Sequence, residues 1–312
     1  MLFWIFGIML LLAALMALIA FICFRMAFYN HNDGRERGKD ILSGKAYEPY
    51  LPLLHQWTES VRSMPHEDFS ITSFDGLKLH AAYYECIPGA PVELLFHGYR
   101  GTAERDMAGG VHRCFSLGRN ALLVDQRASG KSEGHVISFG VNEHKDCLAW
   151  VDFMTKHFGK DVKLILTGIS MGASTVLMCA DKPMPENVVG ILADCGYTSA
   201  RDIIRKVIAD MKMPVSAGYF FVKLGAKLYG HFDLEENPAV DCVQRSLLPV
   251  IFFHGEEDDF VPCDMSRKNF AACTSRKKLV TVPGAAHGIS FPVAPERYVA
   301  ELRDFYPEYS LR

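Results

Sequence analysis

The stretch LILTGISMGAST, residues 164–175, joins an apolar run to a serine that has a glycine two positions away on either side. Gly168-Ile169-Ser170-Met171-Gly172 matches G-x-S-x-G, in which a sharp turn from a strand into a helix presents the serine hydroxyl for attack. The same five residues are also compatible with an ordinary tight turn, because a pattern with three fixed positions often matches by chance. The rest of the chain has to decide between a nucleophile and a turn.

The composition is that of a chain with one large core. Its 312 residues are 49% hydrophobic and 22% charged, and we find neither an internal repeat nor a low-complexity tract. The formal net charge is -3, and the basic residues form no stripe of the kind that phosphate backbones require. The sequence therefore argues against a nucleic-acid partner.

The N-terminal segment, residues 1–24 (MLFWIFGIMLLLAALMALIAFICF), contains no charged side chain, and Arg25 ends the apolar run. Its length matches the hydrocarbon core of a bilayer, so we expect a transmembrane helix. A cleaved signal peptide is disfavoured, because it would have a basic start, a shorter apolar core and a small-residue cleavage site.

The charges that flank this segment predict its orientation. Arg25, Arg35, Arg37 and Lys39 follow it, whereas no basic residue precedes it. Basic flanks are retained in the cytoplasm, so we expect a single-pass protein whose body faces the cytosol. Nine cysteines without a C-x-x-C pair fit reduced thiols in that compartment. Residues 25–68 are interpreted as a juxtamembrane connection with a helix around 51–61.

The globular pattern occupies residues 69–312 and begins with two alternating stretches that meet at Asp75-Gly76, which predicts a β-hairpin. Short apolar runs then alternate with helix-length segments, which predicts a mostly parallel sheet with helices on both faces. The runs are 92–96, 121–124, 164–167, 188–193, 249–253 and 279–282, and the expected helices are 103–117, 142–158, 171–180, 264–273 and 295–305.

Residues just after these strands are candidates for chemistry, because such sheets bind ligands outside the carboxyl ends of their strands. Ser170 follows one strand, Asp258 in FFHGEEDDFVP follows another, and His287 in VPGAAHG follows the last. A serine nucleophile needs a base and a group that orients the base, and histidine and aspartate suit these roles. The order Ser, Asp, His along the chain is that of α/β-hydrolases.

Five motifs at strand ends together resemble an α/β-hydrolase of the serine hydrolase group over about residues 69–306. The likeness is greatest to bacterial serine-aminopeptidase-like and membrane-anchored esterase-like members. The motifs are His97-Gly98, the segment 125–132 (DQRASGKS), the Gly168–Gly172 turn, HGEEDDFVP and GAAHG. One departure is Ala128, which replaces a glycine of the usual D-x-R-G-x-G-x-S. We expect that segment to shape a loop.

The resemblance assigns roles to particular residues. The spacing H-G-x-x-D-x-x-V-P selects Asp258 over its neighbour Asp259, while Asp194, also at a strand end, remains an alternative acid. The family's oxyanion hole uses backbone amides, and the positions that correspond are Tyr99 and Met171. His97 and His254 share an H-G context and are expected to stabilise loops.

The resemblance also implies a small helical cap at about residues 197–241. Within it, Phe220, Phe221, Leu224 and Leu228 share one helical face by their spacing. This face either packs on the hydrolase core or lines an acyl pocket, in which case Phe220 and Phe221 bind substrate.

The function expected from these residues is hydrolysis of a carboxylic ester in a small-molecule acyl substrate. Thioester or aminopeptidase-like hydrolysis is the alternative within enzymes, and a membrane-tethered binding protein with an inactive hydrolase fold is the alternative outside them. Neither zinc-ligand spacing nor a phosphate-binding glycine motif is present, so we expect no metal and no cofactor.

Overall fold

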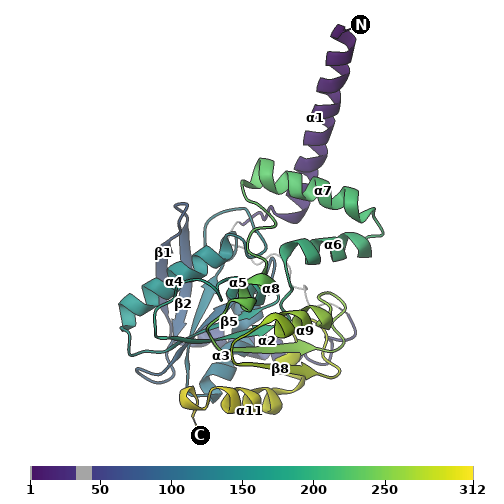
Figure 1. Cartoon of the computed structure of the whole chain (residues 1–312). Coiled ribbons are helices and arrows are strands. Elements are labelled where there is room, and N and C mark those ends of the chain that lie inside the picture. The colour runs from purple at the N-terminus through teal and green to yellow at the C-terminus, as the bar shows by residue number, and fades with distance from the viewer. Residues whose placement is uncertain (1, 33–43, 312) are drawn as a thin grey trace.

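The computed structural model describes residues 2–32 and 44–311 (Figure 1). Its centre is an eight-stranded sheet in the order β1-β2-β4-β3-β5-β6-β7-β8. β2 pairs antiparallel with β1 and β4, and the other pairs are parallel. The strands are β1 (Glu67–Thr72), β2 (Lys78–Tyr84), β3 (Val92–Phe96), β4 (Asn120–Asp125), β5 (Leu164–Ile169), β6 (Val188–Asp194), β7 (Val250–Gly255) and β8 (Lys277–Val282). The predicted mostly parallel sheet is confirmed.

Helices cover both faces of the sheet, because alternate residues of each buried strand point to opposite sides. Leu94 and Phe96 belong to one hydrophobic cluster and Leu95 to another. The first face carries α4 (Glu143–Phe158), α5 (Met171–Met178), α8 (Ala239–Gln244) and α9 (Cys263–Ala272), and the second carries α3 (Ala103–Ser116) and α11 (Pro295–Phe305), with the short α10 (Ser290–Val293) beside it.

The expected juxtamembrane connection contains a helix that packs on the body of the fold. α2 (Leu51–Ser63) includes the predicted helix at 51–61 and lies against α3. A Cβ atom on Gly109 of α3 would lie 2.8 Å from the Trp57 ring, so the two helices touch closely. Arg35, Arg37 and Lys39, which carried part of the orientation argument, lie outside the described residues.

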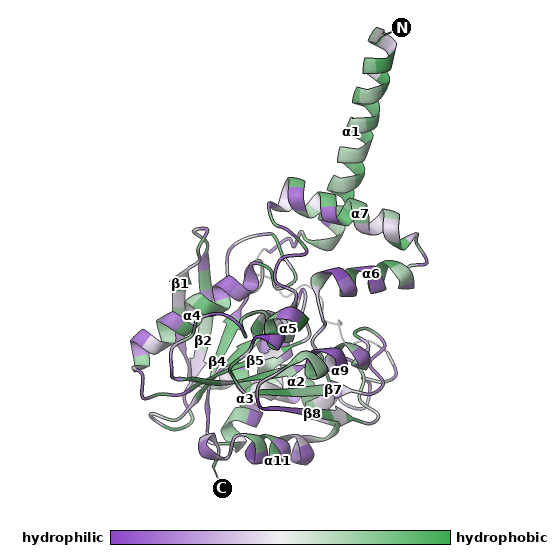
Figure 2. Cartoon of the chain, viewed as in Figure 1, coloured by the Kyte–Doolittle hydropathy of each residue, from purple (hydrophilic) through white to green (hydrophobic). Residues whose placement is uncertain are grey.

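The N-terminal helix α1 (Leu2–Ala27) projects away from the body and is apolar along most of its length (Figure 2). Its segment Phe3–Ala27 is long and apolar enough to cross a membrane, with a mean hydropathy of 3.0. Only 6% of an 18-residue window of this segment is buried. The helix ends at Ala27, slightly later than the expected end of the apolar segment at Phe24.

The segment between β6 and β7 forms a separate helical layer where the cap is expected. It contains α6 (Ala200–Asp210), α7 (Val215–Gly225) and a π-helical turn, Ala226–Gly230. In Figure 1, α6 lies nearer the sheet and α7 lies farther out, across the C-terminal part of α1.

Candidate active site

Ser170 lies between β5 and α5 in a backbone conformation that residues other than glycine seldom adopt, with φ 56° and ψ -116°. The flanking glycines make this turn sterically feasible. A Cβ on Gly168 would lie 2.1 Å from the Gly172 carbonyl carbon, and a Cβ on Gly172 would lie 2.0 Å from the Phe96 carbonyl oxygen. The turn is therefore a strained strand-to-helix turn packed against β3, the context that G-x-S-x-G requires.

The structure brings Ser170, His287 and Asp258 into one hydrogen-bonded chain. Ser170 Oγ lies 2.9 Å from His287 Nε2, and His287 Nδ1 lies 2.7 Å from Asp258 Oδ2. Ser170 and Asp258 are each 7% exposed, whereas His287 between them is only partly buried. A nucleophile, a base and a group that orients the base require this geometry, and the assignment of these roles to the three residues stays a prediction.

Asp258 has hydrogen-bond partners in addition to His287. Its Oδ1 accepts hydrogen bonds from the backbone N–H groups of Phe260 (3.0 Å) and Val261 (2.8 Å). Burial by itself would raise the pKa of Asp258, but hydrogen bonds from His254 and His287 outweigh burial and lower the pKa to about 2. The carboxylate is therefore ionised and fixed at neutral pH.

The sequence analysis did not predict that His254 lies against Asp258. Its fully buried ring places Nε2 3.2 Å from Asp258 Oδ2 and 2.8 Å from the Val261 carbonyl oxygen, while Nδ1 lies 2.7 Å from Ser266 Oγ. It stabilises a loop, as expected, and that loop carries Asp258. The signal available in the sequence was its place at the end of a strand, four residues before the acid.

The alternative acids face other partners. Asp194 accepts hydrogen bonds from Ser290 Oγ (2.9 Å) and Tyr298 OH (3.1 Å), and burial raises its pKa. Asp259 is exposed. Among the described residues, Asp258 supplies the carboxylate that lies within hydrogen-bonding distance of the His287 ring.

The loop after β3 closely approaches the serine. A Cβ on Gly98 would lie 3.6 Å from Ser170 Cβ, and the Gly98 N–H donates to Asp106 Oδ2 at 3.1 Å. His97 braces the same loop, because its Nε2 accepts from the Gln126 N–H at 3.1 Å. This is the loop-stabilising role expected for His97.

The two residues expected to supply oxyanion donors directly follow Gly98 and Ser170 in the sequence. Met171 is the first residue of α5, where backbone N–H groups lack partners within the helix and the helix dipole favours negative charge. Tyr99 directly follows Gly98, and its ring stacks on Phe139 with centroids 4.9 Å apart. Their role in binding an oxyanion stays a prediction.

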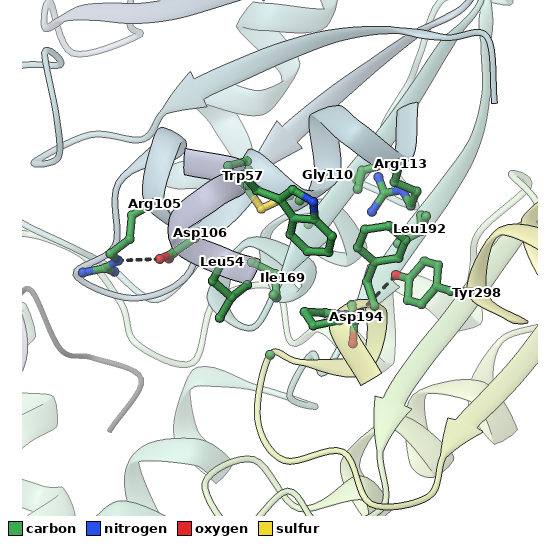
Figure 3. Close-up of a pocket in the computed structure, with 18 residues that line it drawn as sticks. Leu54, Trp57, Arg105, Asp106, Gly110, Arg113, Ile169, Leu192, Asp194 and Tyr298 are labelled. Atoms are coloured by element: carbon green, nitrogen blue, oxygen red, sulfur yellow. Dashed lines mark hydrogen bonds and ion pairs between the residues drawn. The ribbon is translucent and has the colours of Figure 1, made fainter. Parts of the chain in front are cut away.

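A cavity of about 50 Å³ lies near this site, and neither Ser170 nor His287 is among the residues that line it (Figure 3). Ile169 and Gly288, the neighbours of Ser170 and His287, line it, and α2 contributes Leu54 and Trp57. The segment 25–68, which we expected to be a juxtamembrane connection, thus supplies part of the cavity wall.

The two phenylalanines expected to bind substrate are not among the residues that line this cavity. Phe220 is 50% exposed on α7, and its ring meets that of Phe221 edge-on at 5.3 Å. Their binding of an acyl group stays a prediction.

One group of metal-type donors occurs among the described residues. Donor atoms of Cys195, Asp258 and His287 lie within 4.8 Å of one another. Burial, reinforced by the charges of Asp194 and Asp258, raises the pKa of the Cys195 thiol well above its usual value. Asp258 and His287 already bond to each other, so a metal bound here would disrupt the hydrogen-bonded chain to Ser170.

The sheet, the strained serine turn and the order of the strand-end residues define the class: this is an α/β-hydrolase. Residues 137–311, more than half of the chain, match the prolyl oligopeptidase family, and the chain belongs to that family. The matched region includes Ser170, Asp258 and His287, and it excludes α1 and the loop after β3.

Relatives come from bacteria and eukaryotes. The chain is 22% identical to the α/β-hydrolase domain-containing protein WAV2 of Arabidopsis thaliana over 273 residues, 85% of this chain and 87% of WAV2. It is 23% identical to YqkD of Bacillus subtilis over 196 residues, 62% of this chain and 64% of YqkD. The chain thus spans slightly less than two thirds of the length of YqkD.

Similar solved structures share the fold. An esterase of Pyrococcus furiosus superposes with a TM-score of 0.66 at 21% identity, covering 82% of this chain and 95% of that one. Est1E of Butyrivibrio proteoclasticus, solved with bound ferulic acid, superposes with a TM-score of 0.60 at 21% identity, covering 77% of this chain and 98% of its own. Both neighbours support the confirmed α/β-hydrolase fold.

Proposed function

We propose that the chain is a membrane-anchored serine hydrolase that cleaves a carboxylic ester through an acyl-enzyme intermediate. The observation that carries this proposal is the hydrogen-bonded chain from Ser170 through His287 to Asp258, with distances of 2.9 and 2.7 Å. The Pyrococcus furiosus esterase among the structural neighbours supports the same reaction class.

The proposed reaction has two halves. Ser170 Oγ attacks the acyl carbonyl carbon while His287 Nε2 takes the hydroxyl proton, and the backbone amides of Tyr99 and Met171 donate to the oxyanion. His287 then gives that proton to the leaving alcohol, which departs as the acyl-serine forms. Water repeats the sequence: His287 takes its proton, the acid leaves, and the proton returns to Ser170. Asp258 fixes the imidazole throughout.

Peptide hydrolysis is the second candidate, and membership of the prolyl oligopeptidase family favours it. The two candidates share all of these residues, because an ester and an amide differ in their leaving group and not in their acyl chemistry. A series of nitrophenyl esters of increasing acyl length, assayed beside aminoacyl nitroanilides, separates them. Faster turnover of the anilides would make the peptidase the leading candidate.

We further propose that α1 anchors the chain, with the hydrolase body on the cytoplasmic side. The apolar segment Phe3–Ala27 and the basic residues that follow its core support this arrangement. Protease added outside sealed, right-side-out cells should leave the body uncut. Digestion of the body from outside would show that it lies on the opposite side of the membrane.

The nucleophile is tested by replacing it. Ser170→Ala should lower ester turnover by about 10⁶-fold, as loss of the nucleophile does in comparable triads, and should abolish labelling by a fluorophosphonate probe. Circular dichroism should be unchanged, and Ser63→Ala, at an exposed serine of α2, should behave as wild type. If the folded wild-type chain fails to take up the probe, the inactive binding protein becomes the better hypothesis.

A further inference from the structure

The outer edge of the helical layer exposes large apolar side chains. Met211 and Met213, in the turn between α6 and α7, are 51% and 48% exposed, and Phe220 and Leu228 are 50% and 46% exposed. We refer to these four residues as the α7 surface. Within α7 the side chains of Tyr219 and Val222 are buried instead, so the helix has an inner and an outer side.

The C-terminal end of α7 and the π-helical turn after it lie beside the apolar part of α1. A Cβ on Gly225 would lie 2.5 Å from the Ala20 carbonyl oxygen, so the two helix backbones touch. Further along, Tyr229 OH donates to the Ala17 carbonyl oxygen at 2.9 Å. At 1.5 Å per residue, Ala17 lies roughly 12 Å before Arg25 along the helix axis. The end of α7 and the π-helical turn therefore meet α1 within its apolar run.

The direction of α7 relative to α1 indicates how α7 would lie relative to a membrane. It crosses α1 instead of running alongside it, and it lies farther from the sheet than α6 (Figure 1). If α1 spans a bilayer, α7 lies close to the plane of the membrane surface. A helix in that plane with exposed apolar and basic side chains is typical of an interfacial helix.

Charges on and around the surface fit lipid headgroups. Lys212, between the two methionines, and Lys227, next to Leu228, are exposed. Two other lysines of this helical layer are paired with carboxylates: Lys223 binds Glu235, and Lys206 lies 2.6 Å from Asp210. Lysine side chains beside apolar residues can extend to lipid phosphates while their methylene groups remain near acyl chains.

We propose that the α7 surface is a second membrane contact, seated in the headgroup layer of an anionic bilayer. Phe220, Leu228 and the two methionines reach the acyl chains, and Lys212 and Lys227 contact lipid phosphates. The proposal rests on the proposed anchoring by α1, and it gives Phe220 a lipid contact in place of a contact with bound substrate. It fixes the hydrolase at a set height and orientation, since one spanning helix alone leaves the body free to tilt.

Tryptophan fluorescence in vesicles tests this contact in the full-length chain. The vesicles contain phosphatidylglycerol and phosphatidylcholine brominated in the upper acyl chain. In a Trp4→Phe background, Phe220→Trp should lose fluorescence to the bromolipid, whereas Leu247→Trp, at a residue of the body that is 93% exposed, should not. Equal quenching of the two variants would overturn the proposal.

A separate readout distinguishes failure of the contact from failure of the anchor. Trp4 of α1 is 75% exposed, and the quenching lost in Trp4→Phe reports whether α1 enters the bilayer. Quenching of Trp4 without quenching of Phe220→Trp refutes the α7 contact and leaves the anchor intact. Absence of both refutes the anchor, and the α7 contact with it.

The lysines are tested in the same assay. Replacing both by glutamine, Lys212→Gln with Lys227→Gln, should reduce the gain in Phe220→Trp quenching that phosphatidylglycerol produces. Lys160→Gln removes an exposed lysine of the body and should leave that gain unchanged. A gain that persists in the double variant would refute the role of the lysines.

Discussion

Asp258 does not depend on His287 for its position. Two backbone N–H groups bind its Oδ1, and the buried His254 lies beside its Oδ2. In the proposed reaction, Asp258 would therefore stay in place while His287 changes its protonation state. Fixed donors of this kind require no rearrangement when charge develops on the imidazole.

The first prediction separates the two aspartates at strand ends. Asp258→Asn should lower kcat by about 10⁴-fold, as loss of the orienting carboxylate does in a serine protease triad, because the imidazole is then held in the wrong tautomer. Asp194→Asn should lower stability and leave most of kcat, because Asp194 bonds to Ser290 and Tyr298. Steady-state kinetics on folded variants would contradict the assignment of the acid if Asp194→Asn showed the larger loss of kcat.

Strand ends let the sequence predict which residues meet, because parallel strands align their carboxyl ends at one edge of the sheet. Ser170, Asp258 and His287 come from three such ends. The same rule marks His254 as close to the site, but it does not say which way a buried ring points. That orientation depends on Ser266, from α9, whose hydroxyl lies 2.7 Å from His254 Nδ1.

At the scale of elements, the C-terminal end of α1 bonds to the loop that carries Tyr99. The last carbonyl groups of a helix lack partners within it, and side chains from this loop supply two. Tyr99 OH donates to the Ala27 carbonyl oxygen at 2.8 Å, and Arg100 Nη2 donates to that of Met26 at 2.8 Å. The proposed anchor and the proposed oxyanion donor are thus connected.

A second prediction tests that connection. Tyr99→Phe keeps the ring that stacks on Phe139 and removes the bond to Ala27, a loss of about 1 kcal/mol, so it should lower kcat several-fold if the loop shifts. Tyr229→Phe removes a similar bond to α1, at Ala17, far along the chain from this loop, and should leave kcat unchanged. Equal kcat values for Tyr99→Phe and wild type would show that the loop holds its position without α1.

Periodicity predicted the strands well and the surroundings of α7 less well. The spacing of Phe220, Leu224 and Leu228 assumes a regular helix, but the chain turns π-helical at Ala226–Gly230, which shifts the phase of later side chains. Phe220 and Leu228 are about half exposed, so their face is not packed on the core. Sequence reasoning had no means to place α1 beside Gly225, because that contact joins distant parts of the chain.

At the scale of the whole molecule, a buried ion cluster ties the second face of the sheet to the C-terminus. Glu93 of β3 is fully buried between Arg113 and Arg119, at 2.5 Å from each. Arg119 also donates to the Tyr309 carbonyl oxygen at 2.7 Å. Burial alone would raise the pKa of Glu93, but the two guanidinium groups outweigh it and lower the pKa to about 2.

This cluster predicts how stability depends on pH. The folded pKa of Glu93 lies below its unfolded value, so the stability it contributes is complete above about pH 5 and is lost as the pH falls toward 2. Glu93→Gln should cost about 3 to 5 kcal/mol of unfolding free energy at neutral pH, because it leaves two buried guanidinium groups uncompensated. The difference from wild type should shrink on acidification.

Urea unfolding of the full-length chain in detergent, repeated across that pH range, measures this difference. Asp304→Asn, which removes an exposed partner of Lys278, should change little at any pH. A difference between Glu93→Gln and wild type that stays constant down to acid pH would assign the acid sensitivity to other carboxylates.

The bond between Tyr229 and Ala17 joins residues 212 positions apart, which sets an order of events during biosynthesis. The N-terminal helix leaves the ribosome first, and its docking partner follows only after another 212 residues, roughly 10 to 40 seconds later at cellular rates of translation. If α1 is the proposed anchor, the small residues that α7 will cover face lipid or an insertion factor during that interval. The proposed anchor would therefore enter the bilayer before the hydrolase body has been made.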